Sequence, residues 1–125
     1  YAATKHAIEG YSESLDHELR TMGIRVSVIE PAFMKTAIDA NSRDADAKLD
    51  AYRDVRIAMD ARLKEMLDVA EEPDVVADTV LKAASAASPK ARYTAGTAAA
   101  RLRLMHTLLP ASLLDAGIRK QLRIA

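Results

Sequence analysis

The sequence predicts an α/β fold in which amphipathic helices alternate with short strands. Residues 24–30 are dominated by β-branched side chains and lie between Gly23 and Pro31, which is typical of a buried strand. Residues 91–95 form a second, shorter strand pattern that ends at Gly96. Apolar residues recur at helical spacing before each of these stretches, so the expected order is helix, strand, helix, strand.

Composition excludes several classes of protein. The 125 residues are 50% apolar and carry a formal net charge of zero, whereas a nucleic-acid-binding protein normally has a basic excess. The absence of cysteine excludes disulfides and thiolate metal sites. The sequence has no apolar run long enough to span a membrane and no cluster of metal ligands. We therefore expect a cytoplasmic protein that binds neither metal nor nucleic acid.

The first helix pattern covers residues 1–22 and ends at Gly23, which can adopt the positive φ of a helix C′ position. Within it, Tyr1 and Lys5 lie one turn apart on the same face. The apolar residues of this helix recur every three or four positions: Ile8, Tyr11, Leu15, Leu19 and Met22.

Tyr1 and Lys5 form a candidate proton-transfer pair. A phenol has a pKa of about 10, which is too high for efficient acid–base catalysis near neutral pH. An ammonium about 5 Å from the hydroxyl, at an effective dielectric of about 20, would favour the phenolate by about 3 kcal/mol. The alternative is a Tyr at the edge of the core beside a solvated Lys, since this spacing also occurs by chance. The flanking sequence favours the catalytic interpretation.

Two motifs resemble the short-chain dehydrogenase/reductase family. Its catalytic Tyr-x-x-x-Lys helix matches Tyr1-Ala-Ala-Thr-Lys5, and its Pro-Gly-x-x-x-Thr strand end matches Pro31-Ala-Phe-Met-Lys-Thr36. The resemblance implies a Rossmann-type, doubly wound parallel sheet, of which residues 1–125 would be the C-terminal part of a single NAD(P)-binding domain. The family's glycine-rich dinucleotide loop and its catalytic Ser and Asn would lie upstream, so residues 1–125 alone are expected to be inactive.

The resemblance also implies a function and a set of site residues. The intact enzyme would transfer a hydride between NAD or NADP and a carbonyl or alcohol carbon. Tyr1 would exchange the proton of the substrate oxygen, and Lys5 would assist it and hydrogen-bond the nicotinamide ribose. The nicotinamide carboxamide would be held at the strand end, by Pro31, Ala32, Phe33, Met34 and Thr36. Ala32 departs from the family's Gly and could crowd the cofactor. Thr36 could also be a helix N-cap, and it can have both roles at once.

The sequence from Lys5 to Ser14, together with the Ile-Glu-Pro strand end, looks most like the hydroxysteroid- and retinol-dehydrogenase-like branch. That likeness implies a lipophilic alcohol or ketone as substrate. Residues 37–72 would be the substrate loop, with a loop over Asp39–Ser42 and a long helix over residues 43–68. The apolar face of this helix could close over the substrate, or could be packed without touching it. Its members are Ala45, Leu49, Tyr52, Met59, Leu63 and Met66.

A helix is expected to begin near Glu71 and to end at Ser88-Pro89. Residues 97–125 then form a basic tail of two helical pieces separated by Pro110. The tail could pack within a homodimer or homotetramer, the form typical of the family, or could lie on a membrane surface, and packing is the preferred interpretation. Arg101, Arg103, Arg119, Lys120 and Arg123 supply its positive charge.

Two other functions remain open at this stage. Nucleotide-sugar epimerases and dehydratases share the Tyr and Lys, although the stretch from Pro31 to Thr36 argues against them. A non-catalytic binding module on the same scaffold is the second alternative.

Overall fold

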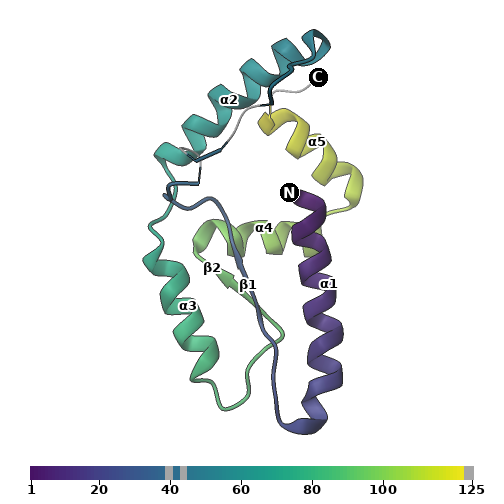
Figure 1. Cartoon of the computed structure of the whole chain (residues 1–125), viewed down its shortest axis with the longest axis vertical. Helices are drawn as coiled ribbons and strands as arrows, with labels where there is room; N and C mark the ends of the chain where they lie inside the picture. Colours follow the sequence, from purple (N-terminus) through teal and green to yellow (C-terminus); the bar gives the residue numbers. More distant parts are fainter. Residues whose placement is uncertain (39–40, 43–44, 123–125) are drawn as a thin grey trace.

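The computed structural model describes residues 1–38, 41–42 and 45–122. It contains five α-helices, two short 3₁₀ helices and two strands within these residues, and Figure 1 shows their arrangement. In chain order they are α1 (Ala2–Leu19), η1 (Arg20–Met22), β1 (Val28–Pro31), η2 (Asp50–Tyr52), α2 (Arg53–Asp68), α3 (Asp74–Ala84), β2 (Arg92–Ala95), α4 (Thr97–Leu108) and α5 (Ala111–Leu122). The predicted α/β class is confirmed.

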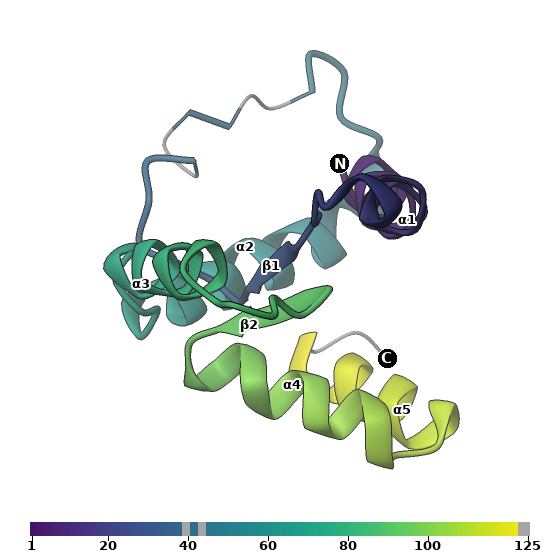
Figure 2. The ribbon, with the colours of Figure 1, turned by 90° about the horizontal axis from the view of Figure 1, so that it is seen from below.

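β1 and β2 pair in parallel, in a register that runs from Val28 opposite Arg92 to Pro31 opposite Ala95. Parallel strands need a long crossover, and α2 and α3 supply it. α3 packs on both strands and α4 packs on β2 (Figure 2). The carboxyl ends of both strands therefore meet at one edge of the sheet.

The C-terminal end of α1 is fixed to the following segment through Asp16, which is 1% exposed. Its carboxylate accepts hydrogen bonds from the Arg25 Nε and the Val26 N–H, each at 2.9 Å, and forms an ion pair with Arg20. Hydrogen bonds from Arg25, Arg20 and the Val26 N–H hold the pKa of Asp16 well below its usual range. Gly23, with φ of 77°, reverses the chain as predicted.

A second polar cluster joins α1 to both strands. Arg92 on β2 donates to Glu13 at 2.7 Å and to Glu9 at 3.0 Å, and it also pairs with Glu30 on β1. Arg103 on α4 pairs with the other oxygen of Glu30 at 3.0 Å. The hydrogen bond and charge of Arg92 lower the pKa of Glu13. The Arg92 guanidinium group and the Glu30 carboxylate thereby link α1, β1, β2 and α4.

The N-terminal end of α4 is capped from a distant part of the chain. The backbone N–H and the hydroxyl of Thr97 donate to Glu71 Oε1 at 3.0 and 3.1 Å. A carboxylate here satisfies a helix N–H that lacks an intrahelical partner and interacts favourably with the helix dipole. Gly96 has φ of 90°, and a Cβ at this position would lie 1.9 Å from Glu71 Oε2. Glycine is thus needed both for the backbone conformation and for the space beside Glu71.

Several predicted boundaries are corrected by the structure. The helix predicted over residues 43–68 begins later, because residues 45–49 are not helical and α2 begins at Arg53 after η2. The first strand is confined to Val28–Pro31, where β2 provides hydrogen-bonding partners. The helix expected to end at Ser88 already ends at Ala84.

The two tail helices and the break at Pro110 are confirmed. Residues 39–40 and 43–44, which belong to the predicted loop and helix, and Arg123 of the basic tail lie outside the described residues.

Few apolar side chains are buried in the described chain. The buried ones are Met34, Ala83, Ala95 and Ala99. The apolar stripe of α1 is open to solvent, since Ile8 is 51% exposed and Tyr11 is 67% exposed. Polar contacts therefore account for much of the attachment of α1. No helix in the described part of the chain is long and apolar enough to cross a membrane.

We predict that Asp16→Asn lowers Tm by several degrees at pH 7, because the neutral amide loses the charge that two arginines surround. The native pKa of Asp16 lies below its ordinary value of 3.8, so its contribution to stability is present above about pH 4 and is lost as the pH falls toward the native pKa. Thermal melts at several pH values should show the difference from wild type shrinking below pH 4. Asp78→Asn, at an exposed position of α3, is the control and should have little effect.

We predict that Gly96→Ala lowers the free energy of unfolding by about 1–3 kcal/mol, because alanine is strained at positive φ and its methyl group would collide with the Glu71 carboxylate. Denaturant titration measures the change. The same substitution in a Glu71→Ala background should cost less, since the colliding atoms are then absent. An equal cost in both backgrounds would show that the collision does not contribute.

Candidate active site

The first turn of α1 brings Tyr1 and Lys5 together. The Lys5 backbone N–H donates to the Tyr1 carbonyl at 3.0 Å, and the Lys5 Nζ lies 5.4 Å from the centroid of the Tyr1 ring. This distance is within the range of a cation–π contact. Tyr1 is 84% exposed, so a small molecule can reach its phenol. The geometry agrees with the spacing argument: both groups lie on one face, one turn apart.

The predicted cofactor segment begins at the last residue of β1. Pro31 is the final residue of the strand, Ala32 is half-buried and Thr36 is exposed. Phe33 is 46% exposed, whereas Met34 is 9% exposed and points into the structure. Phe33 and Thr36 are therefore exposed to solvent, whereas Met34 is not.

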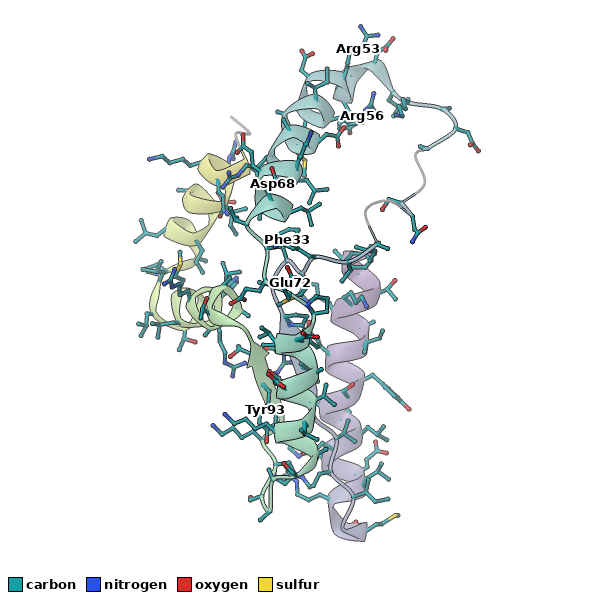
Figure 3. All side chains as sticks on the ribbon, turned by 90° about the vertical axis from the view of Figure 1, so that its left-hand side faces the viewer. Phe33, Arg53, Arg56, Asp68, Glu72 and Tyr93 are labelled. Atoms are coloured by element: carbon teal, nitrogen blue, oxygen red, sulfur yellow. The ribbon has the colours of Figure 1, made fainter. Side chains whose placement is uncertain are left out.

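The two halves of the predicted site lie at the same end of the molecule. Figure 1 shows that α1 descends from the N-terminus and that the chain then returns through β1 in the opposite direction. The segment after β1 consequently comes back to the level at which α1 begins. In Figure 3, Phe33 lies at the height of the N-terminal end of α1. The N-terminal end of α1 and the segment after β1 thus lie at the same level of the molecule.

The chemistry of this edge fits a nicotinamide group. A carboxamide has both a donor and an acceptor, so it requires polar groups of both kinds. The Thr36 hydroxyl supplies both and makes no hydrogen bond to the residues that the structure describes. The Lys5 ammonium adds a cation at the same end. Lys5, Thr36 and the backbone near Phe33 are the residues that would hold the group.

One important residue at this edge was not identified from the sequence. Glu71 forms a parallel bridge with Met34, and its carbonyl accepts the Lys35 N–H at 3.0 Å. Sequence reasoning interpreted Glu71 as the acidic start of a helix, whereas α3 begins at Asp74. A possible signal was Gly96, because a glycine directly after a strand and before a helix often permits close approach of another group.

A groove of about 410 Å³ lies between the strands and α4. Its lining includes Pro31 of the predicted site, together with Arg92 and Arg103 of the polar cluster, but not Tyr1 or Lys5. We therefore locate the candidate active site at the exposed strand edge and not in this groove. Residues 1–38, 41–42 and 45–122 contain no group of three or more His, Asp or Glu side chains arranged to hold a metal ion.

Comparison with known proteins identifies relatives of this chain. Residues 1–47, which include both motifs, match the family model described as short chain dehydrogenase. An uncharacterized oxidoreductase of Schizosaccharomyces pombe is 35% identical over 97 residues, which cover 77% of this chain and 40% of the relative. Human retinol dehydrogenase 16 is 29% identical over 129 residues, covering 93% of this chain and 41% of that protein. Mouse 17-beta-hydroxysteroid dehydrogenase type 6 is 27% identical over 132 residues, covering 92% and 40%.

The chain spans about two fifths of the length of these relatives, at 40%, 41% and 40%. The match extends from the Tyr1–Lys5 helix to the C-terminal helices in the two mammalian proteins, since it covers more than nine tenths of this chain. Taken with the parallel sheet and with the two motifs, these matches show that the chain belongs to the short-chain dehydrogenase/reductase family.

Proposed function

We propose that the full-length protein transfers a hydride between NAD or NADP and the carbonyl or alcohol carbon of a lipophilic substrate. The observation that supports this proposal is that the Tyr1–Lys5 pair and the strand-end segment lie at the same end of the molecule. The names of the retinol and hydroxysteroid dehydrogenases among its relatives support a lipophilic alcohol or ketone. We also propose that the protein acts in the cytoplasm.

In this proposal the bound nicotinamide supplies or accepts the hydride. In the reducing direction, the Tyr1 hydroxyl donates its proton to the substrate oxygen and later recovers a proton from water. In the oxidising direction, the same oxygen accepts the alcohol proton. Lys5 stabilises the negative charge that develops on the Tyr1 oxygen, because its ammonium is held one turn away on the same helix face. Thr36 and the backbone near Phe33 orient the carboxamide.

We propose that α2 forms part of the substrate side of the site. Leu63 and Met66 on α2 are half-buried, while Met59 is 41% exposed. α5 packs against α2, so the tail helps to support this surface. Unbranched Met side chains can adapt to apolar substrates of varied shape.

We further propose that the protein forms homodimers or homotetramers. Exposed leucines on α4 and α5 offer apolar surface for such contacts; they include Leu102, Leu104, Leu108 and Leu113. Nucleic acid is not a proposed partner, because the sequence has equal numbers of basic and acidic residues. Contact with a membrane surface is the less favoured role for these leucines.

Tyr1→Phe in the full-length protein should reduce kcat by about 10²–10⁴-fold, because it removes the proton donor, while cofactor Kd should stay within about twofold of wild type. Lys5→Ala should impair both turnover and cofactor binding. Steady-state kinetics and fluorescence titration measure the two quantities. Tyr11→Phe removes a hydroxyl from the same helix at an exposed position and is the matched control. A near-normal kcat in Tyr1→Phe would contradict the proposed role.

Replacing Met59 and Met66 by Ser should raise KM for an apolar substrate by about tenfold, through loss of apolar contact, and should change cofactor Kd much less. Met22→Ser makes the same chemical change in η1, at the other end of α1, and should leave KM unaltered. Equal effects on substrate KM and cofactor Kd would indicate general destabilisation and not a substrate contact.

A further inference from the structure

We propose that Glu71 is a positioning residue that holds the strand-end segment of residues 32–36 in the conformation that binds nicotinamide. The inference rests on the proposed function, since it assumes that this segment contacts the cofactor. Glu71 itself is not at the reacting atoms; it acts through the backbone of Met34 and Lys35.

The backbone of Glu71 fixes the path of the segment after β1. It pairs with Met34 in a parallel bridge, and its carbonyl accepts the Lys35 N–H at 3.0 Å. The contact lies between the proposed ligands Phe33 and Thr36 in the sequence. A shift of Glu71 would therefore move the backbone on which both ligands depend.

The side chain of Glu71 fixes the position of that backbone. Its Oε1 accepts both the N–H and the hydroxyl of Thr97, at 3.0 and 3.1 Å, at the beginning of α4. Its Oε2 is buried against Gly96, where the absence of a Cβ provides the space. Ala95, directly before Gly96, is 0% exposed and belongs to β2. One residue thus ties the segment after β1 to the residues after β2.

The neighbouring Glu72 makes a different kind of contact. Its Oε1 lies 2.8 Å from the Lys35 Nζ, but the two side chains are 62% and 47% exposed, respectively. Exposed ion pairs contribute little to stability because solvent screens them. In Figure 3, Glu72 is labelled below Phe33, which is itself below Asp68 near the end of α2. Glu72 therefore shares the location and charge of Glu71 but makes no hydrogen bond to Thr97 and no bridge to Met34, which makes it a matched control.

Loss of the Glu71 carboxylate should act on nicotinamide binding specifically. When Glu71 is released from Thr97, the segment occupies its binding conformation for only part of the time. The apparent Kd of a ligand rises by the reciprocal of that fraction, so an occupancy of about one tenth weakens binding about tenfold. A ligand that lacks the nicotinamide does not touch the segment and should be unaffected.

The experiment is a pair of titrations on the full-length protein, performed well below Tm. The probes are NADH or NADPH, whichever binds wild type more tightly, and the corresponding ADP-ribose or 2′-phospho-ADP-ribose, which lacks nicotinamide. Glu71→Ala should weaken dinucleotide binding about tenfold and leave ADP-ribose binding within about twofold of wild type. Glu71→Gln should restore most of the affinity, because its amide oxygen can still accept from Thr97. Glu72→Ala should change neither affinity by more than about twofold.

The outcomes separate the possible failures. Equal weakening of both ligands by Glu71→Ala would show general destabilisation and overturn the proposal, as would equal effects of Glu71→Ala and Glu72→Ala. If Glu71→Ala does not fold, Thr97→Val is the substitute variant, because it removes the hydroxyl that donates to Glu71 and keeps the backbone N–H. It should weaken dinucleotide binding by a smaller factor than Glu71→Ala. Unchanged dinucleotide binding in Thr97→Val would also overturn the proposal. A wild type that binds the dinucleotide no more tightly than ADP-ribose would instead refute the cofactor contact itself, and the proposal with it.

Discussion

The parallel pairing of β1 with β2 is the constraint on which the rest of the structure depends. Parallel strands place their carboxyl ends at one edge, so the segment after Pro31 and the turn after Ala95 become neighbours although they are far apart in the sequence. The crossover through α2 and α3 is a direct consequence. Glu71 lies in that crossover, where its backbone meets the first of these segments and its carboxylate meets the second.

Polar contacts are unusually important here because few apolar side chains are buried among the described residues. Asp16 holds the C-terminal end of α1, and Arg92 holds its middle through Glu9 and Glu13. Polar contacts differ in how much they stabilise the fold. Asp16 is almost completely buried and accepts several hydrogen bonds, whereas the Lys35–Glu72 ion pair is exposed to solvent. Loss of a buried anchor leaves a charge without its partners, so it is the more damaging change.

The candidate site combines residues on a helix with a segment whose conformation depends on tertiary contacts. Tyr1 and Lys5 are fixed relative to each other by the helix backbone, which needs no long-range contact. The segment from Ala32 to Thr36 is not helical or paired along its length, and its conformation depends on tertiary contacts such as the bridge to Glu71. The proposed hydride transfer would require both parts to be correctly positioned, because misplacement of reacting groups by about 1 Å can cost about 10²-fold in rate.

Local rules were sufficient to predict the helix–strand order, the glycine turn at Gly23, the break at Pro110 and the one-turn relation of Tyr1 to Lys5, because each depends on neighbouring residues. Family resemblance then assigned chemistry to the two motifs, and the comparisons confirm the family. Other features depend on contacts between distant parts of the chain. β1 is limited to the residues that β2 pairs, α2 begins later than its apolar pattern suggested, and Glu71 caps a helix that begins 26 positions later. Spacing along the sequence cannot reveal such a contact, since it exists only after the parallel crossover has brought both strand ends to the same edge.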